Sequence, residues 1–166
     1  MRTKLAVKCS GLLAVLAFFS VTAIGADLLA GTWKMNAAKS KYSPGPGFRN
    51  NTVKFEPVEG GIKLAADGID TNGKRIQNEY IVKFDGKDYP TKQLTDGKPN
   101  PNAADAVSWK KIDDYTYEQT NKFKGKTLTI ARHKISKDGN TREVTTTGTN
   151  IQGQKLNNFL VFEKLR

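Results

Sequence analysis

The sequence predicts an all-β protein: an antiparallel up-and-down β-barrel of about 8–10 strands that follows a short N-terminal leader. From Gly31 onward, apolar and polar residues alternate in short segments, as in half-buried strands, and no stretch keeps a helical period for three turns. Clusters of Gly, Asn and Asp separate the segments. Pairs such as Asn72-Gly73 and Asp96-Gly97 suit the tight turns that join antiparallel strands.

These turn signals divide the chain into ten expected strands. They cover residues 31–36, 52–58, 62–69, 75–84, 88–94, 105–112, 115–122, 127–135, 141–149 and 156–164. Two connections are longer, 37–51 and 95–104, and the Pro-Gly stretch of the first excludes a long helix there. Short hairpins favour pairing in chain order, and closure of such a meander into a barrel removes both exposed sheet edges. A two-sheet sandwich of the same strands is the structural alternative.

The first 26 residues have the layout of a secretory signal peptide. Arg2, Lys4 and Lys8 precede an apolar run of about 14 residues, 11–24, and small residues follow it. The run is shorter than the roughly 20 residues that cross a bilayer as a helix. We therefore expect residues 1–26 to be removed and residues 27–166 to form a single barrel domain. The protein is expected to be periplasmic or secreted, without stable membrane insertion.

Cysteine content and charge exclude several classes of site. The only cysteine, Cys9, lies in the leader, so the mature chain has no disulfide, no thiol nucleophile and no Cys metal ligand. The net charge of +11 falls to +8 without the three leader cations, and the remaining cations alternate with acids and Thr. A solvated outer face accounts for most of them, and we expect no nucleic-acid partner. Attraction to an anionic envelope polymer remains an alternative.

Alternation along each strand assigns one side to the interior, and some polar residues fall on that side. The pattern places Asn78 with Tyr80, Tyr117 with Gln119, and Arg132 with its apolar neighbours two and four residues earlier. An unpaired polar group in a solid core costs about 1–3 kcal/mol, so these residues indicate a cavity that holds water or a polar part of a ligand.

The ligand-binding residues predicted from this pattern are Arg132, Tyr80, Tyr117 and Asn78. An inward guanidinium can clamp a carboxylate with two parallel hydrogen bonds, which makes Arg132 the central member of the set. The alternative is that Arg132 lies at the barrel mouth, reaches out to water, or pairs with an acid.

No catalytic residue, metal ligand or cofactor-binding residue is predicted. His133, the only histidine, has the opposite parity to Arg132 and is expected to face solvent, where it cannot serve a nucleophile or a metal. Paired carboxylates such as Asp113-Asp114 fall where turns need Asp.

Both ends of the expected barrel resemble the calycin superfamily, the lipocalins and intracellular fatty-acid-binding proteins. Gly31-Thr32-Trp33 resembles the Gly-x-Trp that opens their barrels, and residues 161–165, Val-Phe-Glu-Lys-Leu, look like the closing strand of the fatty-acid-binding proteins. Residues 129–132, Thr-Ile-Ala-Arg, are similar to the strand that carries one of their inward arginines. The resemblance implies a calycin barrel with Trp33 at its closed end, beneath a cation from the final strand, either Lys164 or Arg166.

The same comparison shows two departures. Where fatty-acid-binding proteins place Arg-x-Tyr to hold a carboxylate, this chain has Leu160 and Phe162, and residues 37–51 are too short and too rich in Pro and Gly for a helical lid. Residues 31–36, with Lys39-Ser40-Lys41-Tyr42 and Pro44-Gly45-Pro46, resemble a group of small exported bacterial lipocalin-like proteins with no assigned activity.

The sequence therefore predicts an exported lipocalin-like protein, not an enzyme, that binds a small hydrophobic or amphipathic molecule. The ligand is expected to be partly apolar, and an anionic ligand is one option. The alternative is a non-enzymatic interaction module that binds an anionic envelope polymer or an acidic protein partner through its basic outer face. The oligomeric state stays open.

Overall fold

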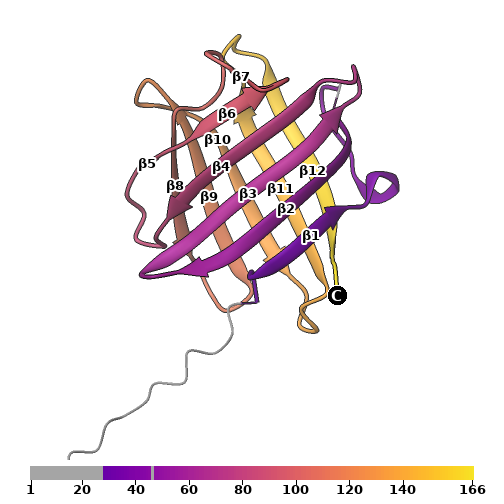
Figure 1. The fold of residues 1–166 in the computed structure, drawn as a ribbon, viewed down its shortest axis with the longest axis vertical. Coiled ribbons are helices and arrows are strands. Elements are labelled where there is room, and N and C mark those ends of the chain that lie inside the picture. The colour runs from indigo at the N-terminus through magenta and orange to yellow at the C-terminus, as the bar shows by residue number, and fades with distance from the viewer. Residues whose placement is uncertain (1–27, 46) are drawn as a thin grey trace, which may run out of the picture.

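The computed structural model describes residues 28–45 and 47–166, and they form one antiparallel sheet of 12 strands curled into a barrel (Figure 1). This confirms the predicted fold class; the predicted signal peptide, residues 1–26, lies outside the described residues. The strands are β1 (Gly31–Met35), β2 (Phe48–Val58), β3 (Gly61–Asp70), β4 (Arg75–Val82), β5 (Tyr89–Pro90), β6 (Lys92–Thr95), β7 (Lys98–Pro99), β8 (Ala106–Lys111), β9 (Thr116–Phe123), β10 (Lys126–Ile135), β11 (Thr141–Thr149) and β12 (Lys155–Lys164).

One continuous ladder of hydrogen bonds holds the barrel together. The strands lie in the order β5-β8-β9-β10-β11-β12-β1-β2-β3-β4-β6-β7. Strand β1 pairs with both β2 and β12, so it joins the wall made by β1–β4 to the wall made by β8–β12, and the sandwich alternative is wrong (Figure 1). Between β1 and β2 lies a 3-10 turn, η1 (Ala37–Lys39), and among the described residues no helix is long and apolar enough to span a membrane.

Local turn chemistry explains two of the tight turns that join neighbouring strands. The turns that follow β6 and β9 each place two consecutive residues at positive φ, 51° at Asp96 and 77° at Gly97, and 49° at Lys124 and 76° at Gly125. Two positive φ angles define the turn whose twist matches that of the flanking strands.

The prediction of a single strand over residues 88–94 is wrong, because this segment forms two short strands, β5 and β6, separated at Thr91. Strand β5 pairs with β8, whereas β6 pairs with β4, so this segment passes from one edge of the sheet to the other. Side chains also bridge the gap between β4 and β8, where Nε1 of Trp109 donates a hydrogen bond to the hydroxyl of Tyr80 at 3.3 Å. The short strand β7 lies within the expected connection 95–104.

The inner face of the barrel is apolar at one end and polar at the other. We call the apolar end, near the C-terminus in Figure 1, the closed end; its buried aromatic residues are Trp33, Phe55, Trp109, Tyr117 and Phe162. We call the opposite end of the barrel, toward β7 in Figure 1, the mouth. The strand register assigns half-buried neutral polar residues to the inner face there, among them Asn51, Asn78, Gln93, Asn121, Thr146 and Asn158.

Candidate functional site

Arg132 does not face the interior, so the prediction that placed it there is wrong. Its side chain is 63% exposed on the outer wall, where Nη2 lies 3.4 Å from Oε2 of Glu118. His133, expected to face solvent, is instead buried. The register decides both positions, because His133 lies opposite the buried Tyr117 on β9 and the buried Val144 on β11. Directly opposed residues of an antiparallel sheet share a face.

The arginine inside the barrel is Arg142 on β11, which is 2% exposed. Its Cζ atom lies 4.2 Å from the ring centroid of Phe162, 5.0 Å from that of Phe55 and 5.5 Å from that of Trp33. The faces of aromatic rings attract cations, and this attraction is stronger away from water. We call these three rings the aromatic cage.

One edge of the Arg142 guanidinium has no hydrogen-bond acceptor among the described residues. Nη1 lies 3.0 Å from Nδ1 of His133, whereas Nε and Nη2 are buried without a partner. Nε and Nη2 together form the side of a guanidinium that can bind both oxygens of a carboxylate. Burial lowers the pKa of Arg142 to about 9, so the group is still a cation at neutral pH. The barrel therefore encloses a positive charge whose carboxylate-binding edge is not used by the protein.

A chain of hydrogen bonds runs from Arg142 toward the mouth, and its direction is fixed by the first donor. A guanidinium can only donate, so Nδ1 of His133 accepts, and the histidine must carry its proton on Nε2. Nε2 then donates to Oε1 of Gln119 at 3.1 Å, Nε2 of Gln119 donates to Oδ1 of Asn121 at 2.7 Å, and Nδ2 of Asn121 donates to Oγ1 of Thr129 at 2.9 Å. We call these five residues the donor chain.

His133 remains uncharged in this position. Burial, assisted by the positive charge of Arg142, holds the pKa of His133 well below its usual value. The imidazole also packs on the indole of Trp109, with ring centroids 4.6 Å apart and planes 35° apart. A neutral histidine can both accept from Arg142 and donate to Gln119, and this dual role connects the two parts of the donor chain.

The other predicted ligand residues are divided between the two ends of the barrel. Tyr80 and Tyr117 are buried at the closed end, and burial raises the pKa of Tyr80 above its usual value. Asn78 is half-buried toward the mouth, where its Oδ1 accepts a hydrogen bond of 2.7 Å from Oγ1 of Thr91. The two tyrosines thus share the closed end with Arg142, and none of the three lies on the outer wall with Arg132.

The cation expected over Trp33 is Lys164. Its Nζ lies 4.9 Å from the Trp33 ring centroid and donates to the carbonyl of Leu28 at 3.0 Å. Trp33 Nε1 donates to the carbonyl of Leu29 at 2.8 Å, and Leu29 is fully buried. This arrangement confirms the predicted structural pair and seals the closed end.

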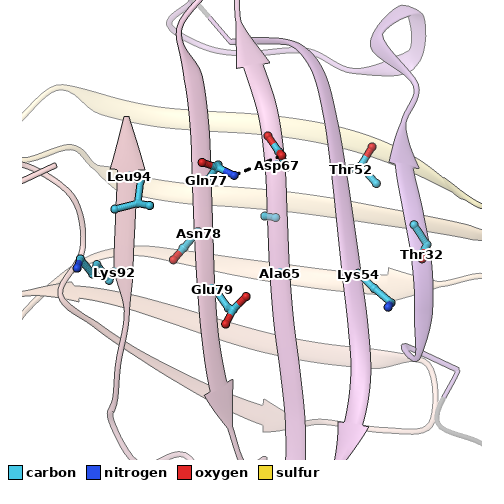
Figure 2. Close-up of a pocket in the computed structure, with 11 residues that line it drawn as sticks. Thr32, Thr52, Lys54, Ala65, Asp67, Gln77, Asn78, Glu79, Lys92 and Leu94 are labelled. Carbon is cyan, nitrogen blue, oxygen red and sulfur yellow. Dashed lines mark hydrogen bonds between the residues drawn. The ribbon is translucent and has the colours of Figure 1, made fainter. Parts of the chain in front are cut away.

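A groove of about 660 Å³ lies on the outer face of β1, β2, β3, β4 and β6 rather than inside the barrel (Figure 2). Its charged side chains are largely paired within the protein: Lys54 with Glu56, Glu79 with Lys63 at 3.0 Å, and Asp67 with Arg75. Figure 2 shows the further hydrogen bond from Gln77 to Asp67 across the groove. Three of the four charged lining residues are thus paired, and Lys92 is the fourth.

Within the described residues, no group of three or more His, Cys, Asp and Glu side chains could hold a metal ion.

The carboxylate of Asp113 stabilises a turn. Its Oδ1 accepts a hydrogen bond from the backbone N–H of Tyr115 at 2.8 Å, and this bond lowers the pKa of the carboxyl group. The carboxylate of Asp85 likewise accepts from the backbone N–H of Lys87 at 3.0 Å.

Comparison with known proteins shows a likeness to solved structures. No family model matches the chain, and no curated protein matches it. The crystal structure of zebrafish ileal bile acid-binding protein complexed with cholic acid aligns with a TM-score of 0.45 and 12% sequence identity, over 83% of this chain and 99% of that chain. A likeness this weak carries no argument about function.

Sequence reasoning missed Arg142, although a signal for it exists. Arg142 stands two residues before Val144, which the alternation assigns to the interior, so the same rule places Arg142 there. Arg142 also lies directly opposite the inward Phe162 on β12, which supports its assignment to the inner face.

Proposed function

We propose that the protein binds a small, partly apolar molecule inside the barrel and that Arg142 holds an anionic group of that molecule. The observation that carries the proposal is the buried, unpartnered edge formed by Nε and Nη2 of Arg142. A buried charge without a counter-charge costs several kcal/mol, and no carboxylate of the described residues pairs with this one. A bound carboxylate supplies both the missing charge and the missing acceptors.

The surroundings of Arg142 favour tight binding of such a group. The aromatic cage keeps water from the guanidinium, and charge-assisted hydrogen bonds are stronger in a region of low dielectric constant. His133 fixes the opposite corner of the guanidinium through Nη1, so the free edge is held in one orientation. The rings also provide apolar surface for the part of the ligand next to its anionic group.

Export belongs to this proposal and is supported by the signal-peptide pattern of residues 1–26. We place the protein in the periplasm or outside the cell on that basis. The alternative function, binding of an anionic polymer through the outer face, gains less support because several outer cations are already paired with acids, among them Lys122 with Asp88 at 2.9 Å.

The test is calorimetric titration of the mature protein with a homologous series of straight-chain carboxylates. Arg142→Met should weaken binding by about tenfold or more, equivalent to ~1.4 kcal/mol per factor of ten. Arg132→Met is the matched control, because it removes an arginine ten residues away that lies on the outer wall, and it should leave binding unchanged. Equal affinity of Arg142→Met and the wild type would refute the proposal. Binding of dextran sulfate alone, lost between low and physiological salt, would favour the alternative.

A further inference from the structure

The inner wall between Arg142 and the mouth changes from apolar to neutral polar side chains on several strands. On β9 the inward positions read Tyr117, Gln119 and Asn121, and on β2 they read Phe55, Val53 and Asn51. On β12 the sequence is Phe162, Leu160 and Asn158, and on β11 Thr146 follows Val144. A pocket for a plain hydrocarbon chain would be lined by apolar residues here. The wall carries amides and hydroxyls instead.

The donor chain determines which hydrogen-bonding groups remain on the β9–β10 side. The side-chain oxygens of Gln119 and Asn121 already accept hydrogen bonds within the chain, at 3.1 Å and 2.7 Å. Each amide therefore retains a second N–H, and Thr129, whose oxygen accepts from Asn121, retains its hydroxyl proton. The β9–β10 side of the inner wall therefore offers hydrogen-bond donors to a ligand.

Strand β2, from the other wall, offers an acceptor. Oδ1 of Asn51 is buried and has no hydrogen-bond partner among the described residues. Such an atom is costly unless something donates to it. Asn78 on β4 differs, because its Oδ1 already accepts from Thr91 at 2.7 Å and its amide nitrogen remains as a donor.

We infer that the ligand carries hydroxyl groups on the part that lies between its anionic group at Arg142 and the mouth: it is a hydroxylated carboxylic acid rather than a plain fatty acid. A hydroxyl both accepts and donates, so it can accept from Gln119 or Asn121 and donate to an acceptor such as Asn51. An alkyl chain in the same place would leave these groups unpaired, and a site built to bind a hydroxyl discriminates strongly against an analogue without one. This inference rests on the proposed function, since it assumes that Arg142 holds the acid.

The experiment compares matched acids with and without hydroxyls. Gluconate and hexanoate share one chain length, and 9,10-dihydroxyoctadecanoate and octadecanoate share a longer one. Calorimetry gives the affinities, and nitrogen–proton correlation spectra follow the Arg142 Nε–H and the side-chain amides of Gln119 and Asn121. We expect the hydroxylated acid of at least one pair to bind about tenfold more tightly or better, and to shift the amide signals that its partner acid leaves in place.

A variant tests the wall separately from Arg142. Asn121→Ala should remove most of the preference for the hydroxylated acid, because it should lower the affinity for that acid by more than it lowers the affinity for the plain acid. Asn157→Ala is the control, because this residue lies on the exposed side of β12, next to the inward Asn158, and should change nothing.

The outcomes separate the two claims. If plain acids shift the Arg142 Nε–H and bind as tightly as the hydroxylated ones, the inference fails and the proposed function stands. If no acid shifts that signal, or if Arg142→Met binds as the wild type does, the proposed function fails and this inference fails with it.

Discussion

Arg142 donates a hydrogen bond of 3.0 Å from Nη1 to Nδ1 of His133, and both side chains are buried on the inner face of the barrel. The guanidinium N–H therefore occupies the lone pair of Nδ1, to which a second proton would have to bind in order to charge the histidine. The pair links the charge state of the histidine to the folding of the barrel.

Stability should fall as the pH drops below about 6.5, the ordinary pKa of histidine. Burial, with a contribution from Arg142, keeps the pKa of His133 well below that value in the folded protein, so only the unfolded chain takes up a proton in this range. The unfolded state then binds more protons, and the free energy of unfolding should decrease by up to ~1.4 kcal/mol per pH unit until the folded pKa is reached. Urea unfolding at a series of pH values from about 7.5 to 5 measures this slope.

His133 is the only histidine, so its replacement isolates the effect. In His133→Gln, an amide can accept and donate in the same region, and the slope between about pH 6.5 and 5 should largely disappear. A wild-type free energy of unfolding that stays constant over this range would contradict the buried, neutral histidine.

Arg142→Met should raise the free energy of unfolding by about 1 kcal/mol in the absence of ligand. The stability gained when the buried charge is removed should exceed the stability lost with the hydrogen bond to His133. Replacing buried charges by apolar side chains is often stabilising. Arg132→Met, on the outer wall, should change stability by less than about 0.5 kcal/mol. A loss of more than about 1 kcal/mol in Arg142→Met would show that the contacts of the aromatic cage outweigh the cost of burying the charge.

The strands could be predicted because their signals are local. Alternation and turn residues lie within a few positions of each other, and the expected ranges correspond to nearly every long strand. The division of residues 88–94 into β5 and β6 could not be predicted, since it depends on which sheet edge each half meets.

The inward face of β10 required information from its neighbours. Ile130 is apolar yet 41% exposed, while Ala131 and Ile135 are buried, so both parities of this strand carry apolar residues. Only pairing with Tyr117 and Val144 settles the face. Arg142 differs, because alternation with Val144 was sufficient to place it inside, but charged residues are seldom fully buried without a partner.

Gly148→Ala should lower the free energy of unfolding by about 3 kcal/mol. Gly148 has a φ of +137°, and a Cβ there would lie 2.2 Å from the carbonyl oxygen of Leu128 and 2.8 Å from Cα of Thr129, both backbone atoms of β10. Thr129 is paired with Gly148 on β11 and with Asn121 on β9, so its backbone cannot move aside without breaking the ladder. The displacement would also disturb Thr129, the last member of the donor chain.

Gly153→Ala provides the comparison for Gly148. Gly153 also has a positive φ, +80°, but a Cβ there meets nothing within 4 Å. The free energy of unfolding of this variant should therefore fall only by the cost of holding Ala at a positive φ, about 1–2 kcal/mol. Equal losses in the two variants would mean that the contact with β10 adds nothing.

Lys164→Met should lower the free energy of unfolding by about 1 kcal/mol, whereas Arg166→Met should leave it unchanged. Lys164 donates to the carbonyl of Leu28 and lies over the Trp33 ring, so its loss removes a hydrogen bond and a cation–π contact at the closed end. Arg166, the other cation expected near Trp33, is exposed in the structure, which makes it a matched control. Thermal and urea unfolding of both variants measure the difference. If Arg166→Met proves as destabilising as Lys164→Met, the assignment of Lys164 as the cation that seals the closed end is wrong.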